Sequence, residues 1–241
     1  MTQQKPAIIL INPQLGENIG MVARAMLNCG LTDLRIVNPR DGWPSDSANA
    51  ASSGAFDNGV TPTIYNSTTE AVNDIHFTLA TTARPRGMIK DVYTAHGATE
   101  QAHVKINKGE NVGILFGAER TGLENDDIAL ANAIITIPLN PKFWSLNLAQ
   151  AVLLVAYEFH TQSDNTPDHQ THMGKTDISN AETVQNFTDR LIEGLSTHDF
   201  FKSPDHRPVI ERSLTNLFAR RQWTDQEIQT LHGVLSAFVK K

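Results

Sequence analysis

The chain has 241 residues, with 20 Lys and Arg against 26 Asp and Glu, so its formal net charge is −6. This balance excludes a strongly basic tail of the kind that binds nucleic acid along its length. Hydrophobic residues make up 40% of the chain, and the 15 Gly and 11 Pro are no enrichment, which excludes a disordered or collagen-like chain. The length allows one large domain, or a domain of about 160 residues with a smaller companion.

The cysteine content and the lengths of the apolar runs indicate in which cellular compartment we expect the protein. Cys29 is the single cysteine, so no internal disulfide can form. The longest uninterrupted apolar run, 151–157, is far shorter than the ~20 residues that span a bilayer. The polar start MTQQKP does not have the pattern of a signal peptide. We therefore expect a cytoplasmic protein with no membrane partner.

Short apolar runs in the first 140 residues are typical of buried parallel strands. They cover 7–11, 34–37, 63–65, 76–80, 112–116 and 133–137. Between the first two, Ile19, Val22 and Met26 share one face of a predicted helix over 18–29, and Gly30 follows as a stop. The repeated pattern predicts an α/β fold with a doubly wound parallel sheet flanked by helices. Such sheets bind ligands beyond the carboxyl ends of their strands.

The rest of the chain is predicted to be helical, with one break. Residues 146–160 form a helix that is apolar on nearly every side, so we expect it to be buried, against the sheet or against another subunit. Residues 161–180 are polar and contain Pro and Gly, as linkers do, and from 181 onward apolar residues recur every three or four positions. We expect an α/β domain over 1–160, a linker over 161–180 and a small helical extension over 181–241.

Polar clusters follow three of the predicted strands. The first cluster, 12–20, contains Asn18 and Gly20 and is followed by Arg24 on the helix. Its glycines and exposed amide groups could hold an anion. An Asn-capped helix with a solvated Arg is the alternative.

The second and third clusters lie at 116–123 and 137–150. In the second, glycines flank Glu119 and Arg120, which could bind the polar end of a cofactor or form a surface ion pair of little weight. In the third, Ser145 and Asn147 open the apolar helix. Capping by Ser145 explains the serine, whereas Asn147 needs a hydrogen-bond partner there.

Hydrolase and metal chemistry are poorly supported. No serine lies in a G-x-S-x-G elbow. His169 and His172 are the closest pair of histidines, but they fall in the polar linker and lack the spacing of a zinc helix. We expect no metal site.

Taken together and in order, the three clusters resemble the motifs of the SPOUT superfamily of RNA methyltransferases, in particular its TrmH-type ribose 2′-O-methyltransferases. The motifs are N-x-G-x-x-x-R, F-G-x-E-x-x-G-L and, after an I-P pair, S-L-N-x-x-x-A. The matching residues are Asn18, Gly20 and Arg24; Phe116, Gly117, Glu119, Gly122 and Leu123; and Ile137, Pro138, Ser145, Leu146, Asn147 and Ala151.

This resemblance implies a parallel sheet with a C-terminal deep trefoil knot, bound S-adenosylmethionine (S-adenosyl-L-methionine), and a homodimer with active sites at the interface. The implied cofactor-binding residues are Thr81, Thr82, Ala83, Gly117, Ile137, Trp144, Ser145 and Leu146. One departure is Phe143-Trp144, where relatives usually have Tyr-Ser. An indole there either stacks on the adenine or narrows the pocket.

Within the group, the chain is most similar to enzymes that methylate the ribose of cytidine or uridine 32 in the tRNA anticodon loop. The segments that carry this narrower match are 20–26, 217–221 and 231–237. The implied partner is tRNA, not DNA. Open alternatives are a 2′-O-methyltransferase of ribosomal RNA or of another tRNA position, and a non-catalytic RNA-binding module on the same scaffold. A nicotinamide-dependent oxidoreductase is disfavoured because the glycine fingerprint is missing.

The resemblance also implies the catalytic residues Arg24, Asn18, Glu119, Ser145 and Asn147. A guanidinium holds its proton, so we expect Arg24 to act as a fixed cation that stabilises the emerging ribose alkoxide and binds the adjacent phosphate. Asn18 would orient Arg24 or the phosphate, with Glu119, Asn147 and Ser145 as polar supports.

Basic residues in two regions are candidates for RNA binding, and a solvated charged surface is the alternative for each. The first region has Arg84, Arg86 and Lys90, and the helical extension has Lys202, Arg207, Arg212, Arg220 and Arg221.

Overall fold

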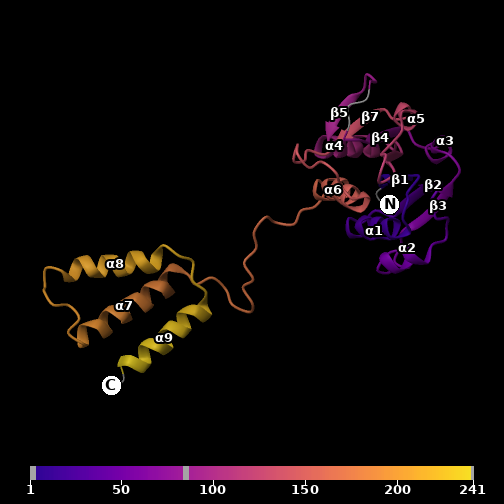
Figure 1. Ribbon diagram of the computed structural model, residues 1–241. Coiled ribbons are helices and arrows are strands. Elements are labelled where there is room, and N and C mark those ends of the chain that lie inside the picture. The colour runs from indigo at the N-terminus through magenta and orange to yellow at the C-terminus, as the bar shows by residue number, and fades with distance from the viewer. Residues whose placement is uncertain (1–3, 84–86, 240–241) are drawn as a thin grey trace. The chain divides into compact units, whose positions relative to one another are not determined.

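The computed structural model describes residues 4–83 and 87–239 (Figure 1). Its contacts divide the chain into two compact units, Met1–Thr166 and Pro167–Lys241. The strands are β1 (Ala7–Ile11), β2 (Asp33–Val37), β3 (Thr61–Tyr65), β4 (Phe77–Thr81), β5 (Asp91–Thr94), β6 (Val112–Phe116) and β7 (Ala133–Thr136). The helices of the first unit are α1 (Gly16–Asn28), α2 (Asp46–Ala51), α3 (Thr68–Ala71), α4 (Ala95–Asn107), α5 (Asn125–Ala129) and α6 (Leu148–Thr161).

The strands of the first unit form a parallel sheet in the order β3-β2-β1-β6-β4-β7-β5. The α/β prediction is therefore confirmed, as are the six predicted strands to within a few residues at their ends. The short edge strand β5 was not predicted from the sequence. Its exposed, partly polar residues lack the apolar run that marks the buried strands.

Alternating side chains of the strands build a core on each face of the sheet. On one face, Ile8, Leu10 and Ile114 pack with α1, α2, α4 and α6. On the other, Ile9 and Leu115 pack with the short helices α3 and α5. Because every strand is parallel, the chain leaves β1, β4, β6 and β7 at one edge of the sheet. That edge is where the polar clusters of the sequence meet.

Helix α6 is buried on one side only. Val152, Val155 and Phe159 face the core, whereas Leu154 and Tyr157 are exposed in the single chain, Tyr157 by 57%. The helix also starts at Leu148, two residues later than predicted. The expectation that this helix is buried on nearly every side is therefore not met within the first unit, where one side of α6 is exposed.

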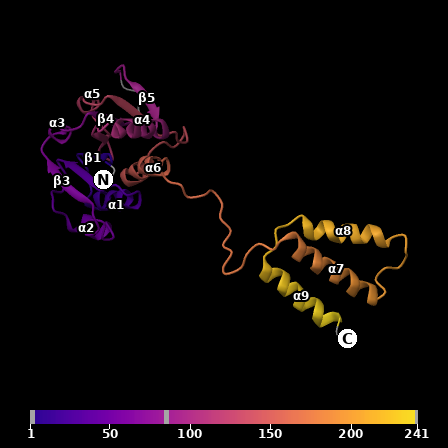
Figure 2. The ribbon, with the colours of Figure 1, turned by 180° about the vertical axis from the view of Figure 1, so that it is seen from behind.

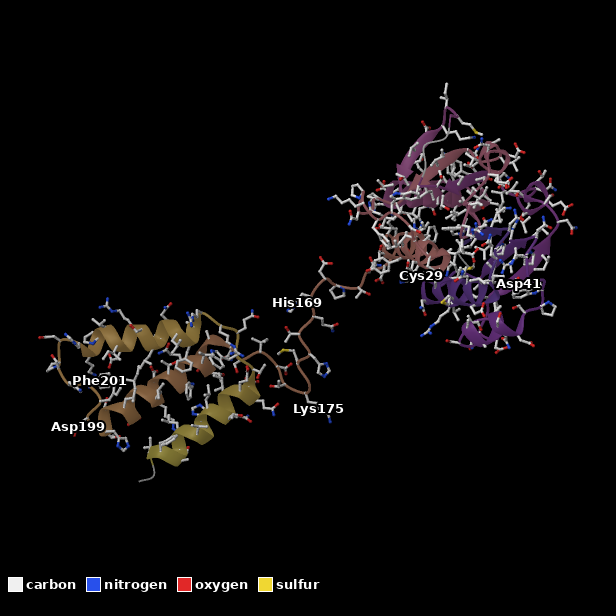
Figure 3. The ribbon with its side chains drawn as sticks, viewed as in Figure 1. Cys29, Asp41, His169, Lys175, Asp199 and Phe201 are labelled. Atoms are coloured by element: carbon white, nitrogen blue, oxygen red, sulfur yellow. The ribbon has the colours of Figure 1, made fainter. Side chains whose placement is uncertain are left out.

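The second unit consists of α7 (Ala181–Thr197), α8 (Arg207–Ala219) and α9 (Asp225–Val239). Both views show α7 between α8 and α9 (Figures 1 and 2). Phe187, Phe218 and Ile228 form its buried cluster. The segment between α6 and α7 is extended, and His169 and Lys175 lie along it (Figure 3). Its last residues pair with this unit, since Ser179 N donates to Trp223 O at 2.8 Å.

None of the helices in the described part of the chain is both long and apolar enough to cross a membrane.

Candidate functional site

A cavity of about 250 Å³ opens at the carboxyl ends of β4, β6 and β7. Its wall is formed by the segments that follow these strands and by the loop before α6. The residues that line this cavity include every one that the sequence resemblance assigned to cofactor binding: Thr81, Thr82, Ala83, Gly117, Ile137, Trp144, Ser145 and Leu146. These residues come from four separate stretches of the chain, and the fold brings them together.

The turn after β6 explains the glycines of the second cluster. Gly122 has φ +69°, in the left-handed region, and its N–H donates to Ala118 O at 2.8 Å. The turn folds back so closely that a Cβ on Gly117 would lie 2.1 Å from the backbone C of Gly122 and N of Leu123. A side chain at Gly117 would therefore force the turn open and reshape the cavity wall.

A hydrogen-bond network joins the three polar clusters beside this cavity. Asn18, which is 4% exposed, donates from Nδ2 to Glu119 Oε1 at 2.6 Å. Asn147 Nδ2 donates to Asn18 Oδ1 at 2.9 Å. The second oxygen of Glu119 accepts from the backbone N–H of Gln14 at 2.9 Å. Glu119 also lines the cavity, so the network connects the first turn of α1 to the cavity wall.

Asn147 both caps α6 and binds Asn18, and these two roles were not distinguished from the sequence. Its Oδ1 accepts from Ala149 N at 2.8 Å as the N-cap of α6, and Gln150 Oε1 accepts in return from Asn147 N at 3.1 Å. The prediction that Ser145 caps this helix is therefore wrong, because the helix begins three residues later. The cap uses only the oxygen of the Asn147 amide, which leaves its NH₂ group for Asn18.

Asn18 is likewise not a helix cap. The N-cap of α1 is Leu15, and Asn18 lies inside the first turn with its side chain buried. The capped-helix interpretation of the first cluster is wrong for this reason. Both polar ends of the Asn18 amide are used by Glu119 and Asn147, which is the partnering that a buried amide requires.

Arg24 lies on the exposed side of α1. Its Nη1 donates to Ser53 Oγ at 3.1 Å. Arg24 is not among the residues that line the cavity of its own chain. Within one chain, then, the cavity and the amide network are assembled without Arg24.

The basic candidates for RNA binding differ in their surroundings. Arg84 and Arg86 lie outside the described residues. Lys90 Nζ donates to the backbone oxygens of Ala129 and Ala131, so it is committed to the end of α5.

In the helical unit, Arg221 lies over the Trp223 ring at 4.6 Å and pairs with Glu227 at 2.7 Å, and Arg207 pairs with Glu211 at 2.7 Å. Arg212 Nε donates to Pro208 O at 3.2 Å. Lys202, Arg212 and Arg220 are exposed.

Among the residues that the structure describes, no group of His, Cys, Asp or Glu could hold a metal ion. Three residues that make the contacts described above were not singled out from the sequence, namely Gln14, Gln150 and Ser53. Gln150 could have been found, since an Asn three residues before a Gln at the start of an apolar run is a capping-box pattern. The other two interact across the fold and carry no local signal.

Comparisons with known proteins agree with these motifs. Residues 5–157 match the model of the SpoU rRNA Methylase family. A protein of Photorhabdus laumondii named tRNA (cytidine/uridine-2′-O-)-methyltransferase TrmJ is 32% identical over 237 residues, covering 97% of this chain and 96% of that protein. The crystal structure of TrmJ from Z. mobilis ZM4 has 46% sequence identity and a TM-score of 0.85, covering 98% of this chain and 99% of that one. The chain is similar to both over nearly its whole length.

Proposed function

The chain belongs to the SpoU rRNA methylase family, and we propose that it is an S-adenosylmethionine-dependent 2′-O-methyltransferase that modifies cytidine or uridine 32 in the tRNA anticodon loop. The observation that carries this proposal is the junction of the cavity with the Asn18–Glu119–Asn147 network. The relatives named for tRNA methylation support the substrate class. A module that only bound RNA would not need this buried polar set beside a cavity.

The residues of the cavity fit the proposed cofactor. Ile135, Ile137 and Leu146 offer an aliphatic wall suited to an adenine ring, and the hydroxyl-bearing Thr81 and Ser145 lie in the same wall. When bound there, S-adenosylmethionine supplies the activated methyl group. The closed turn at Gly117 keeps this wall free of a bulky side chain.

The proposal extends to chain organisation. We assign a methyltransferase domain to 1–160, a linker to 161–180 and a helical extension to 181–241, with the family's deep trefoil knot in the segment that follows β7. The convergence of the ends of β4, β6 and β7 with the loop before α6 supports this segment as the knotted one. The boundary between the compact units, after Thr166, falls within the proposed linker.

A homodimer completes the site in this proposal. Glu17, Met21, Arg24 and Asn28 are exposed along one stripe of α1, and the neighbouring α6 exposes Tyr157. Met21 on α1, together with Leu153, Leu154 and Tyr157 on α6, gives this region exposed apolar side chains, which are typical of a subunit interface. We place Arg24 of one protomer beside the cavity of its partner, because Arg24 is exposed on this stripe and does not line the cavity of its own chain.

In the proposed reaction, Arg24 is the fixed cation beside the ribose 2′-oxygen. Its charge favours transfer of the hydroxyl proton to solvent water and stabilises the developing alkoxide, while its other N–H groups bind the adjacent phosphate. The 2′-oxygen would form its bond to the methyl carbon as the methyl–sulfur bond breaks, and a neutral thioether would leave. Asn18, Glu119 and Asn147 hold the three loops in one arrangement, and Ser145 contributes a hydroxyl to the cavity wall. Arg220 and Arg221 bind tRNA phosphates from the helical extension.

Replacement of Arg24 tests the catalytic assignment. We expect Arg24→Ala to lower the rate of methyl transfer to tRNA by about 100-fold or more, because it removes a charge that acts on the transition state. Calorimetry should show an unchanged affinity for S-adenosylmethionine. Lys108→Ala is the matched control, since this exposed cation follows α4 at the opposite edge of the sheet. Wild-type turnover in Arg24→Ala would contradict the assignment.

A synthetic tRNA tests the target. With a 2′-deoxy sugar at nucleotide 32, methyl incorporation should disappear, because the accepting oxygen is gone. A 2′-deoxy sugar at a neighbouring loop position should leave incorporation intact. Methylation that persists without the 2′-oxygen of nucleotide 32 would point to another tRNA position, and methylation of ribosomal RNA alone would point to the ribosomal alternative.

A further inference from the structure

We propose that Ser53 is a positioning residue for Arg24. The Ser53 hydroxyl accepts a hydrogen bond from Arg24 Nη1 at 3.1 Å and so restricts the orientation of the guanidinium before substrate binds. This inference rests on the proposed function, and it adds to the site a residue from the turn after α2 that none of the three motifs contains.

The approach of α2 to α1 is built into the backbone. A Cβ on Gly20 would lie 2.1 Å from Ala48 O, and a Cβ on Gly16 would lie 2.3 Å from the hydroxyls of Ser45 and Ser47. Two glycines one helical turn apart on α1 therefore permit a contact that other residues would prevent. This contact places the end of α2 beside the part of α1 that carries Arg24.

The turn after α2 is shaped to present Ser53. Ser53 has φ +51°, in the left-handed region that non-glycine residues seldom adopt, and Gly54 follows with φ +81°. The preceding Ser52 is fully buried and donates from Oγ to Asn49 O at 2.8 Å, which anchors the turn to α2. A rare backbone conformation thus directs a hydroxyl toward an arginine that would otherwise be unrestrained on the surface.

The chemical consequence follows from the length of the arginine side chain. An arginine side chain on the exposed side of a helix samples many rotamers. Fixing its torsions for the reaction costs conformational entropy. A hydrogen bond from one Nη group to Ser53 restricts these rotamers before substrate arrives. The other N–H groups of the fork remain available for the phosphate and the ribose oxygen.

Two substitutions can separate the role of the Ser53 hydroxyl from the role of the left-handed backbone, because glycine and asparagine both adopt this conformation. Ser53→Gly removes the acceptor, and Ser53→Asn retains a side-chain oxygen. We expect kcat for tRNA methylation to fall about 5- to 10-fold in Ser53→Gly, in keeping with the loss of an exposed hydrogen bond to a charged group, and to recover in Ser53→Asn. KM for S-adenosylmethionine should match that of the wild type in both variants, and the thermal midpoint should not fall below it, because glycine and asparagine accept the left-handed backbone more readily than serine.

A double-mutant cycle identifies the residue through which Ser53 acts. In the Arg24→Ala background, Ser53→Gly should cause no further loss of kcat. An equal 5- to 10-fold loss in that background, or a failure of Ser53→Asn to recover kcat, would overturn the inference. If Arg24→Ala is impaired while Ser53→Gly is as active as the wild type, the inference fails and the proposed function stands. If Arg24→Ala is itself fully active, both the role of Arg24 and this inference fail.

Discussion

The two compact units of the chain differ in how their helices are held. In the first unit, apolar side chains fill both faces of the sheet, and residues such as Ile8, Leu10 and Phe116 are almost completely buried. In the second, Phe187, Phe218 and Ile228 form the buried cluster of the described residues, while Val209 and other apolar side chains are exposed. The stability of a domain grows with the share of its surface that folding buries. The second unit buries fewer apolar side chains, so its stability depends on far fewer contacts. The comparison predicts that single substitutions affect the two units unequally.

The largest effect is expected from truncation of the central aromatic residue of the helical unit. Phe187 is 3% exposed and packs edge-on against Phe218, with ring centroids 5.1 Å apart. Phe187→Ala should cost about 3–5 kcal/mol, enough to unfold much of a unit with so small a core. Circular dichroism should show loss of helix and proteolysis should cleave within 181–239, while S-adenosylmethionine binding by the first unit persists.

Phe238→Ala is the control for this truncation. Phe238 lies in α9 and is 71% exposed, so the same change should alter the free energy of unfolding by less than about 0.5 kcal/mol. Equal destabilisation by the two variants would show that the buried cluster does not hold the three helices together.

The next effect concerns the close contact of α1 with α2 in the first unit. Gly20→Ala places a methyl group 2.1 Å from Ala48 O, so one helix must shift, at a cost of about 1–3 kcal/mol in unfolding free energy. Urea unfolding of the first unit should report this loss. Gly233→Ala in α9 meets no atom within 4 Å and should instead stabilise the second unit by about 0.5–1 kcal/mol through helix propensity. Destabilisation of similar size by both changes would remove the distinction between the two glycines.

Much of the first unit could be predicted from sequence because its signals are local. Runs of β-branched and other apolar residues predict the buried strands, such as β6. The edge strand β5 was not predicted because it is exposed and has no such run. Gly117, Ile137, Ser145 and Leu146 were assigned to the cavity through motifs that each follow a strand, whereas Thr81, Thr82, Ala83 and Trp144 were assigned only through the family resemblance. The parallel arrangement of those strands then brings the motifs to one edge.

The interactions that complete the site could not be predicted because they join distant segments. Asn18 and Glu119 are separated by 101 positions, and only the pairing of β1 with β6 brings their segments together. The Ser53 hydroxyl reaches Arg24 through packing of α2 on α1, and although Gly16 and Gly20 permit this contact, their spacing does not indicate which helix lies against them. The cap of α6 was assigned to Ser145 rather than Asn147 because both are good capping residues and boundaries read from sequence shift by a few positions.

Buried charge provides a further contrast between the units. In the first, Arg35 is 8% exposed and donates to Asp33, Asp74 and Ala71 O. The hydrogen bond from Arg35 holds the pKa of the Asp74 carboxyl below its ordinary value. In the second, a hydrogen bond from the backbone of Thr224 lowers the pKa of the partly exposed Glu227. Only the first of these carboxylates faces a buried guanidinium.

Of the three destabilising test substitutions, Asp74→Asn should have the smallest effect, and this effect should depend on pH. A carboxyl group whose pKa is lowered by folding stabilises the folded state above its unfolded pKa, and this contribution is lost as the pH falls through the folded pKa. Asp74→Asn should cost about 1 kcal/mol in urea unfolding at pH 7, a small value because 55% of the Asp74 side chain is exposed. The gap to the wild type should narrow below about pH 4. Glu227→Gln should leave the unfolding of the first unit unchanged at every pH, and a gap for Asp74→Asn that stays constant down to pH 2 would show that Arg35 does not act through the charge of this carboxylate.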